Sequence, residues 1–351
     1  MTESTFPDPV SQKQAATELW YSRCGAATAS ALAIRKNWLQ TEFAKGGTVL
    51  RSLRDSEDVE LTNAHYHHQL TGLFREGGNI PPIWARAQGK DTVVVGITWV
   101  DEYQGILTRV GSGIRGVEDL AGKRVALPVH GNLIDFQRGA AEHGFVTALG
   151  LAGKARSSAR FIDVPVPARA PRSVRGDAYR AETEALLSHK VDAIFVRFAR
   201  GARLAKDPRF QQVIDLNQHP DPLVRVNNGT PRPVTVDRPF LGRHPELVVR
   251  YLTVLLQTAA WAEANRAEVF ELLRSDTGAA TVEDVLASHG PNVHRSFTPR
   301  LTPEYVVGLE TQKNFLRDHG YLEKDFAILD WIDPGPLAAA QARLEAGRKA
   351  S

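Results

Sequence analysis

The sequence predicts an α/β protein of two lobes, on three observations. Short apolar runs rich in Val, Ile and Leu alternate with helical patterns, which is typical of open α/β sheets. The chain has 351 residues, and chains of this length usually form more than one domain, each with its own hydrophobic core. Two segments, 98–106 and 224–236, are expected to cross between lobes, because the first leaves a buried strand and the second is rich in Asn, Gly and Pro.

The individual elements follow from these patterns. The first strand is expected at 17–22, and later apolar runs predict strands at 93–100, 123–129, 159–166, 190–198 and 212–216. Apolar residues at three- and four-residue spacing predict helices at 27–45, 116–123, 178–190, 244–274 and 302–322. The polar stretch 169–177 is expected to be a solvent loop.

The two crossings divide the chain into domains. Residues 1–102 and 228–351 are expected to form domain I, and residues 103–227 an inserted domain II. Two lobes joined by two crossings form a hinged interdomain cleft. Ligands of α/β proteins usually bind in such clefts, outside the carboxyl ends of the strands.

Composition narrows the class of protein. Hydrophobic residues make up 42% and charged residues 24%, as in ordinary folded proteins, and the net charge of +3 is interspersed, so nucleic-acid binding is not favoured. A mild positive charge suits a small anionic ligand, although solubility explains it equally well. The chain shows neither a secretory signal nor an apolar run long enough for a membrane helix, so we expect a cytoplasmic protein without membrane contact.

The only cysteine, Cys24, directly follows the first expected strand, and a helix is expected to begin within a few residues. Unpaired amides and the dipole at a helix N-terminus lower the pKa of a thiol and favour the reactive thiolate. The alternative is inert packing, because free cysteine is among the most buried residue types.

A second stretch, 63–89, offers partners for this thiol. A helix is expected to begin at Pro81, and Gly77 and Gly78 ahead of it would let backbone amides close around an anionic oxygen. Two helix N-termini, one after Cys24 and one after Gly78, are expected to converge on one anion. The guanidinium of Arg75 would add a planar pair of hydrogen-bond donors for an oxyanion. The alternative is that Arg75 is an ordinary surface arginine.

The same stretch contains three histidines, His65, His67 and His68. They could bind a metal ion if the stretch is a strand, because alternate residues of a strand lie on the same face and imidazole is a common metal ligand. No acidic residue or second cysteine stands at ligand spacing nearby, so a metal site is disfavoured. A role as acid, base or orienting partner of a cysteine requires only one histidine and no further ligands. A histidine that only forms hydrogen bonds within a turn requires no functional partner at all.

Taken together, Tyr-Ser-x-Cys at 21–24, then His65, Arg75 ten residues later and Gly78 three residues beyond resemble the hydroxybiphenyl sulfinate desulfinases. These are the last enzymes of bacterial dibenzothiophene desulfurisation. A looser similarity extends over 117–127, 190–198 and 311–325.

The resemblance implies the two-lobed fold of type II periplasmic binding proteins, especially those for sulfonate and taurine uptake. It implies hydrolytic cleavage of the carbon–sulfur bond of an aryl sulfinate, releasing sulfite, with no metal or organic cofactor. By the same resemblance Cys24 is the essential thiol, and His65 orients or exchanges protons near it. Arg75 and the amide of Gly78 hold the sulfinate oxygens, and Ser22 is a supporting hydrogen-bond donor.

Two mechanisms suit these residue types. The Cys24 thiolate attacks the sulfinate sulfur and the adduct is hydrolysed, or the thiol protonates the ring carbon while Arg75 and backbone amides stabilise the departing oxyanion. A helix terminus favours the thiolate, whereas a bound anionic sulfinate raises the thiol pKa again. The sequence leaves both mechanisms open.

The residues that would contact the aryl group differ from the family. After His65, the family's aromatic residues and glutamine are matched by Tyr66, His68 and either Leu70 or Gln69. In the second lobe, the aromatic residue that contacts the aryl group is expected to be Phe136 or Phe145. His130 and Asn132 nearby either add polar contacts to the ligand or are turn residues.

A competing hypothesis is a non-catalytic binding protein or sensor for aromatic sulfonates or sulfinates, which has no need of a thiol at its anion site. In either case the expected partner is a small molecule, and the chain is expected to be a monomer.

Overall fold

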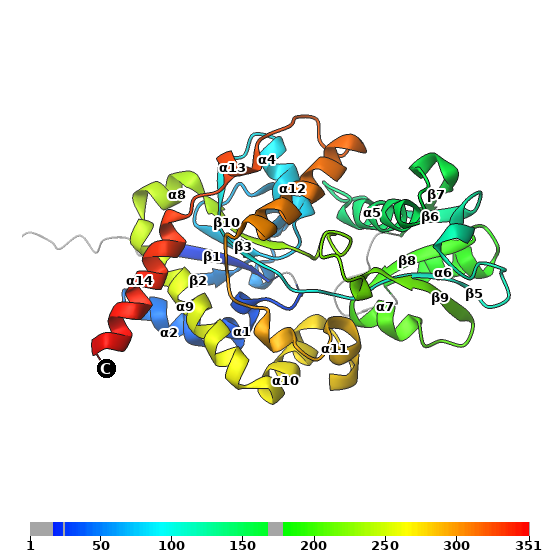
Figure 1. Cartoon of the computed structure of the whole chain (residues 1–351). Helices are drawn as coiled ribbons and strands as arrows, with labels where there is room; N and C mark the ends of the chain where they lie inside the picture. The colour runs from blue at the N-terminus through cyan, green and yellow to red at the C-terminus, as the bar shows by residue number, and fades with distance from the viewer. Residues whose placement is uncertain (1–16, 24, 168–177, 351) are drawn as a thin grey trace, which may run out of the picture.

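The computed structural model describes residues 17–23, 25–167 and 178–350, and these residues form two five-stranded sheets (Figure 1). Cys24 and the whole of the expected solvent loop at 169–177 lie outside the described residues.

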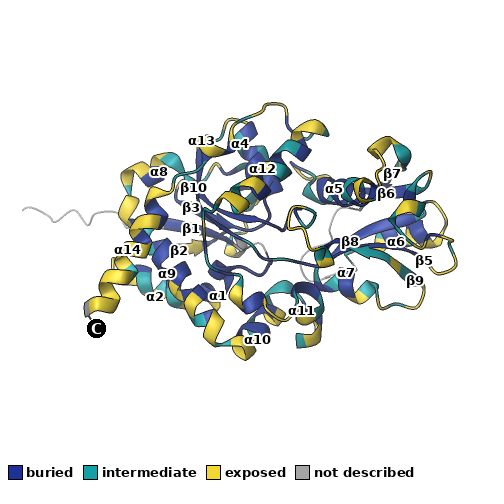
Figure 2. Ribbon diagram, viewed as in Figure 1, coloured by how far each residue is buried: buried dark blue, intermediate teal, exposed yellow. Residues whose placement is uncertain are grey.

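The first sheet has the strand order β2-β1-β3-β10-β4. Its members are β1 (Glu18–Arg23), β2 (Val49–Ser52), β3 (Leu73–Glu76), β4 (Thr92–Thr98) and β10 (Arg232–Asp237). β1 is parallel to β2 and β3, whereas β10 runs antiparallel to both β3 and β4. All seven residues of β4 are buried, as expected of a strand covered on both faces. Figure 2 shows β3 and β10 of the same sheet in the dark blue of buried residues, whereas α14 is largely exposed.

The second sheet has the order β7-β6-β8-β5-β9. Its members are β5 (Gln104–Arg109), β6 (Arg124–Val129), β7 (Arg160–Pro165), β8 (Ala193–Arg197) and β9 (Phe210–Asp215). The six strands expected from apolar runs are confirmed, with ends that differ by a few residues. The chain enters this sheet after β4 and leaves it after β9, while the domain boundaries near residues 102 and 228 stay a prediction.

Helices cover both faces of the two sheets (Figure 1). They are α1 (Ala29–Arg35), α2 (Trp38–Ala44), α3 (Val59–His67), α4 (Ile80–Ala87), α5 (Phe136–Leu151), α6 (Arg180–Leu187), α7 (Phe198–Leu204), α8 (Arg238–Arg243), α9 (Pro245–Ala264), α10 (Arg266–Thr277), α11 (Val282–His289), α12 (Pro303–Asp318), α13 (Ile328–Trp331) and α14 (Gly335–Ala350). Among the described helices, none has the length and hydropathy to cross a bilayer.

Three expected helices differ in detail. The pattern at 27–45 forms two helices, α1 and α2, because Asn37 between them adopts a left-handed backbone with φ of 59°; asparagine tolerates this conformation better than most residues. The pattern at 244–274 likewise divides at Asn265, into α9 and α10. The segment 116–123 forms only a short 3₁₀ helix, Val117–Leu120.

One hydrophobic cluster joins the two sheets. It contains Ile80 and Ile83 of α4, Phe145 of α5 and Leu316 of α12, together with buried residues from β4 and β6. Two further clusters cover the remaining faces, one on each sheet. The side of the molecule formed by α4, α5 and α12 is therefore a continuous core and not an open cleft.

Polar contacts reinforce this side. His143 of α5 stacks on Phe315 of α12 with 4.0 Å between ring centroids, and its Nδ1 lies 3.1 Å from Oε1 of Gln312. Tyr321 donates a 2.6 Å hydrogen bond to Glu142. Burial lowers the pKa of His143 to about 4, so its imidazole is neutral at physiological pH and adds no charge to the interface.

The shared cluster predicts a large effect of Leu316→Ala. Leu316 is fully buried, so its truncation should lower the free energy of unfolding by about 2–5 kcal/mol, as measured by chemical denaturation. Val307→Ala on the exposed face of the same helix is the matched control, with a change of about 0.5 kcal/mol or less. Equal effects of the two substitutions would show that α12 does not bury Leu316 in the shared core.

Candidate active site

The candidate site lies where β1 and β3 end side by side. Ser22 near the end of β1 pairs in register with Arg75 of β3, and Arg75 pairs on its other side with Thr235 of β10. Both strands are parallel, so their carboxyl ends meet at one edge of the sheet, where α/β proteins usually bind ligands.

His65 reaches this edge from the last turn of α3. Its Nδ1 forms a short hydrogen bond with Oγ of Ser22. Asp58 fixes the start of this helix by accepting a 2.8 Å hydrogen bond from the amide of Glu60. The hydroxyl and the imidazole therefore form a pair able to hold or move a proton at the edge of the sheet.

The assumption that the three histidines alternate on a strand is wrong, because His65 and His67 belong to α3. Nε2 of His67 lies 3.2 Å from Oε1 of Glu60, away from the Ser22 pair. Within the described ranges, no group of three or more His, Cys, Asp or Glu side chains has the geometry of a metal site.

Arg75 is fully buried, so the alternative of a surface arginine is wrong. Its Nε donates to the carbonyl of His65 at 3.2 Å, and its Nη1 donates to the carbonyl of Gly78 at 2.8 Å. The guanidinium thereby ties the end of α3 to the turn after β3 and places a positive charge beneath the edge of the sheet.

His68 ends α3 in a left-handed conformation with φ of 55° and is buried. Its pKa lies well below the ordinary range, first because burial disfavours the imidazolium and then because Arg75 and His67 are nearby. Its Nε2 is buried and has no hydrogen-bond partner among the described residues. The site thus holds a neutral imidazole beside the Arg75 charge.

Aromatic rings extend from His65 toward the second sheet. Tyr66 lies edge-on to His65 at 5.0 Å and faces Phe136 of α5 at 6.2 Å with an interplanar angle of 24°. Phe145 is instead fully buried beside Phe161 and Phe195. Of the two phenylalanines expected to contact the aryl group, Phe136 is therefore the one that lies against Tyr66.

His130 is a turn residue, one of the two roles expected for it. Its amide and Nδ1 both bind the carboxylate of Asp135, at 2.7 and 3.1 Å. Asp135 in turn caps α5 by accepting from the amide of Arg138.

The expected convergence of two helix N-termini on one anion is wrong. At α1, the amides of Ala29 and Ser30 donate to the buried carboxylate of Glu76, at 3.2 and 2.8 Å. At α4, the amide of Ile80 donates to Oδ1 of Asn228 at 3.0 Å, and the two prolines that follow have no N–H. Protein groups already occupy these donors.

The helix itself begins where Pro81 predicted, with α4 starting one residue earlier, at Ile80. Gly77 and Gly78 are both buried. A Cβ on Gly78 would lie 2.8 Å from the side chain of Asn228. Glycine therefore allows the backbone of this turn to lie close to the Asn228 side chain.

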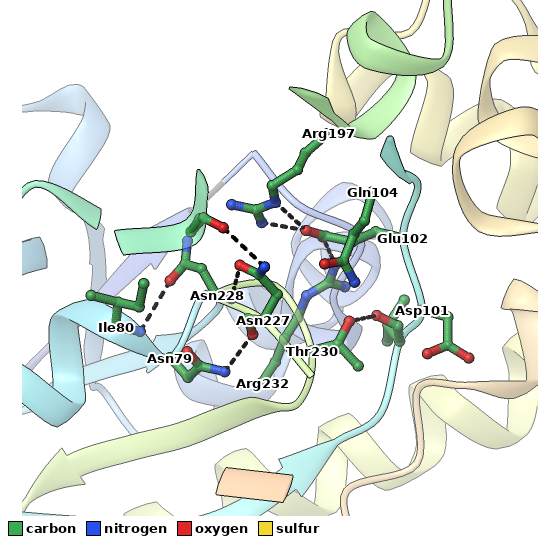
Figure 3. A network of polar contacts seen from close by, with 12 residues as sticks. Asn79, Ile80, Asp101, Glu102, Gln104, Arg197, Asn227, Asn228, Thr230 and Arg232 are labelled. Carbon is green, nitrogen blue, oxygen red and sulfur yellow. Dashed lines mark hydrogen bonds and ion pairs between the residues drawn. The ribbon is translucent and has the colours of Figure 1, made fainter. Parts of the chain in front are cut away.

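The sequence pointed to none of the buried ionic residues that surround the site. Glu76, Glu102, Arg197 and Arg232 are all at most 6% exposed, and three of them form one ionic network (Figure 3). The available signal was a charged residue at or close to the end of an apolar strand run: Glu76 and Arg197 end β3 and β8, Arg232 begins β10, and Glu102 lies just before β5. Charged residues are rarely buried unless they are paired.

Comparison with known structures defines the class of fold. The chain matches a putative periplasmic sulfonate-binding protein SsuA from Methylobacillus flagellatus KT with a TM-score of 0.70 at 14% identity, covering 94% of this chain and 95% of that one. It matches DSZB, solved as a mutant in complex with biphenyl-2-sulfinic acid, with a TM-score of 0.72 at 23% identity, covering 93% and 99%. The fold is that of the periplasmic-binding-protein-like structures, as predicted.

Sequence comparison points to a particular relative. The 2'-hydroxybiphenyl-2-sulfinate desulfinase of Rhodococcus erythropolis is 25% identical, over 77% of this chain and 81% of the relative. No protein-family model matches the chain. The predicted resemblance to the hydroxybiphenyl sulfinate desulfinases is therefore confirmed as a similarity.

The surroundings of His68 predict its titration. In NMR spectra of the labelled protein, its imidazole should show no protonation midpoint near pH 6.5, the ordinary value, which the denatured chain should display. Because the pKa is lowered only in the folded state, the unfolded chain binds more protons below about pH 6.5, and His68 then reduces stability as the pH falls. A folded-state midpoint at or above 6.5 would contradict the burial of a neutral His68 beside Arg75.

Proposed function

We propose that this chain is a desulfinase that hydrolyses the carbon–sulfur bond of an aryl sulfinate. An aryl sulfinate and water would yield the arene and hydrogen sulfite. The observation that carries the proposal is the Ser22–His65 pair beside the buried Arg75, in a chain similar to 2'-hydroxybiphenyl-2-sulfinate desulfinase.

Each residue of the proposed site has a role that its chemistry supports. Arg75 supplies a buried positive charge for the sulfinate oxygens, and the amides of Gly77 and Gly78 are further donors at the same turn. His65, held by Ser22, orients or exchanges a proton near the thiol. Cys24, which follows Ser22 by two residues in the sequence, is the proposed reacting group.

The role of Cys24 has two forms. As a thiolate it attacks the sulfinate sulfur, and the carbon–sulfur bond breaks as the ring carbon takes a proton from His65 or from water. Water then hydrolyses the sulfur adduct to hydrogen sulfite and the free thiol. As a thiol it protonates the ring carbon, and the carbon–sulfur bond breaks while Arg75 stabilises the sulfur-bound oxygens. Water then adds to the released sulfur dioxide to give hydrogen sulfite, and the proton set free returns to the thiolate. A bound sulfinate beside the thiol raises the thiol pKa, which favours the second form.

The proposed contacts of the aryl group are Tyr66, His68 and Phe136. Tyr66 and Phe136 offer ring faces from the two lobes, and the neutral His68 adds a polar group without a second buried charge. We expect these residues to govern which aryl group is accepted.

A second candidate function is the binding of sulfonates without catalysis, which the fold likeness to SsuA favours. Cys24 and the Ser22–His65 pair favour the enzyme, because a binding protein has no need of a thiol at its anion site. The cytoplasmic location and the monomeric state stay predictions.

Sulfite release tests the catalytic proposal. The purified protein should release sulfite from 2'-hydroxybiphenyl-2-sulfinate or from another member of a panel of aryl sulfinates, as measured with a sulfite-specific dye. Cys24→Ser should bind the matching aryl sulfonate with unchanged affinity and release no sulfite, because the hydroxyl is a far weaker nucleophile and acid than the thiol. Tight sulfonate binding by a wild-type protein that releases no sulfite would select the binding function instead.

Arg75→Ala should weaken binding of an aryl sulfonate by about 2–5 kcal/mol in titration calorimetry, because it removes a buried, charge-assisted contact to the anion. Arg75→Lys keeps the charge and should lose less. Arg86→Ala, on the neighbouring helix α4 and paired with Asp91, is the matched control and should bind as the wild type does. An unchanged affinity of folded Arg75→Ala would place the anion elsewhere.

A further inference from the structure

The loop that leads from β1 to α1, residues 25–28, is held from two sides by buried charged side chains. Arg232, the first residue of β10, donates from Nη1 to the carbonyl of Ala27 in a short hydrogen bond. From the other side, Glu76 accepts the amides of Ala29 and Ser30, and Thr98 donates to the same carboxylate at 3.2 Å. Arg232 and Glu76 are 0% and 1% exposed.

Arg232 is itself held by a carboxylate that reaches the second sheet (Figure 3). Oε2 of Glu102 accepts from Nη2 of Arg232 at 2.9 Å. Oε1 of Glu102 accepts from Nε of Arg197 at 2.9 Å and also from its Nη2. Arg197 ends β8, so one carboxylate joins an arginine from each sheet.

The position of Glu102 is closely constrained. A Cβ on Gly229 would lie 2.1 Å from its carboxylate, so the crossing at 227–231 packs directly against it. Thr230 in that crossing donates to the carbonyl of Val100 at 2.8 Å, which ties the two crossings together. The space around the Glu102 carboxylate is therefore too small for it to turn toward other hydrogen-bond partners.

The energetics favour a geometric role for this cluster. Removing charges from water costs several kcal/mol per ion, and a buried ion pair is often no more stabilising than apolar residues of similar volume. Charge-assisted bonds of a guanidinium do, however, impose direction. Two arginines that share one carboxylate would repel each other without it, so the arrangement depends on the Glu102 side chain.

We propose that Arg232 is a positioning residue for the loop that follows Cys24, and that Glu102 couples this loop to the second sheet through Arg197. Cys24 is three residues before Ala27, so a displacement of the anchored carbonyl is transmitted along a very short tether. The inference rests on the proposed function, because it assigns Cys24 as the reacting group. We therefore expect the reactivity of the Cys24 thiol to depend on the Glu102 network.

The single cysteine makes this testable without any assumption about substrate. The rate of alkylation by iodoacetamide reports on Cys24 alone and should be measured from about pH 6 to about pH 10, where thiols ordinarily titrate. Glu102→Gln should shift this pH profile and lower kcat for sulfite release by about tenfold or more, with little change in KM. Arg197→Gln should act in the same direction, and Arg197→Lys should restore part of the effect.

Arg200→Gln is the matched control, since Arg200 lies half-buried in α7 one turn after Arg197, and it should leave both readouts unchanged. The unfolding midpoint of each variant is measured alongside. If Glu102→Gln does not fold, Arg197→Lys and Arg197→Gln carry the test, because both leave Glu102 paired with Arg232.

The outcomes separate this inference from the proposed function. Lower unfolding midpoints with a wild-type alkylation profile and a wild-type kcat would overturn the positioning role and leave a purely structural cluster. A shifted alkylation profile in a protein that releases no sulfite from any sulfinate would support positioning and refute the desulfinase. Sulfite release by the variants at the wild-type rate would refute positioning and leave the desulfinase standing.

Discussion

The antiparallel insertion of β10 between β3 and β4 is the constraint on which the rest of the site depends. Hydrogen bonds in this position set Thr235 opposite Arg75 and Arg232 opposite Thr98. They bring the second crossing back to the strand edge where Ser22 and Arg75 lie. Without this strand, neither the Asn228 contact at α4 nor the Arg232 contact at the α1 loop would form.

The buried charges at this edge favour an anionic ligand. Arg197 and Arg232 share the buried Glu102 carboxylate, whereas Arg75 donates to the carbonyls of His65 and Gly78. Burial raises the pKa of Glu76, although hydrogen bonds from α1 and Thr98 oppose the effect. Under the proposed function, the buried Arg75 charge would act on a bound anion more strongly than a surface arginine would, because it is shielded from water.

The two sheets meet through direct contacts. α5 packs on α4 and α12 in a shared core, and the Glu102 carboxylate joins Arg197 of the second sheet to Arg232 of the first. The residues around the strand edge are therefore held by contacts from both sheets.

Much of the framework could be predicted from the sequence. Strand periodicity located six strands, and proline chemistry located the start of α4. The resemblance to the desulfinases singled out Ser22, His65 and Arg75, and the structure brings these three residues together. The predicted use of helix N-termini failed, because sequence shows that amides are present but not that Glu76 and Asn228 already occupy them.

The sequence by itself determined the α/β class and the order of the elements, since these depend on local periodicity, whereas Ser22, His65 and Arg75 were singled out by the resemblance to the desulfinases. Only the tertiary structure decided that His68 is neutral, that Phe136 and not Phe145 meets Tyr66, and that Glu102 bridges Arg197 and Arg232. The physical reason is the range of the interactions. Burial and ion pairing arise between residues far apart in the chain, and no local pattern records which of them will meet.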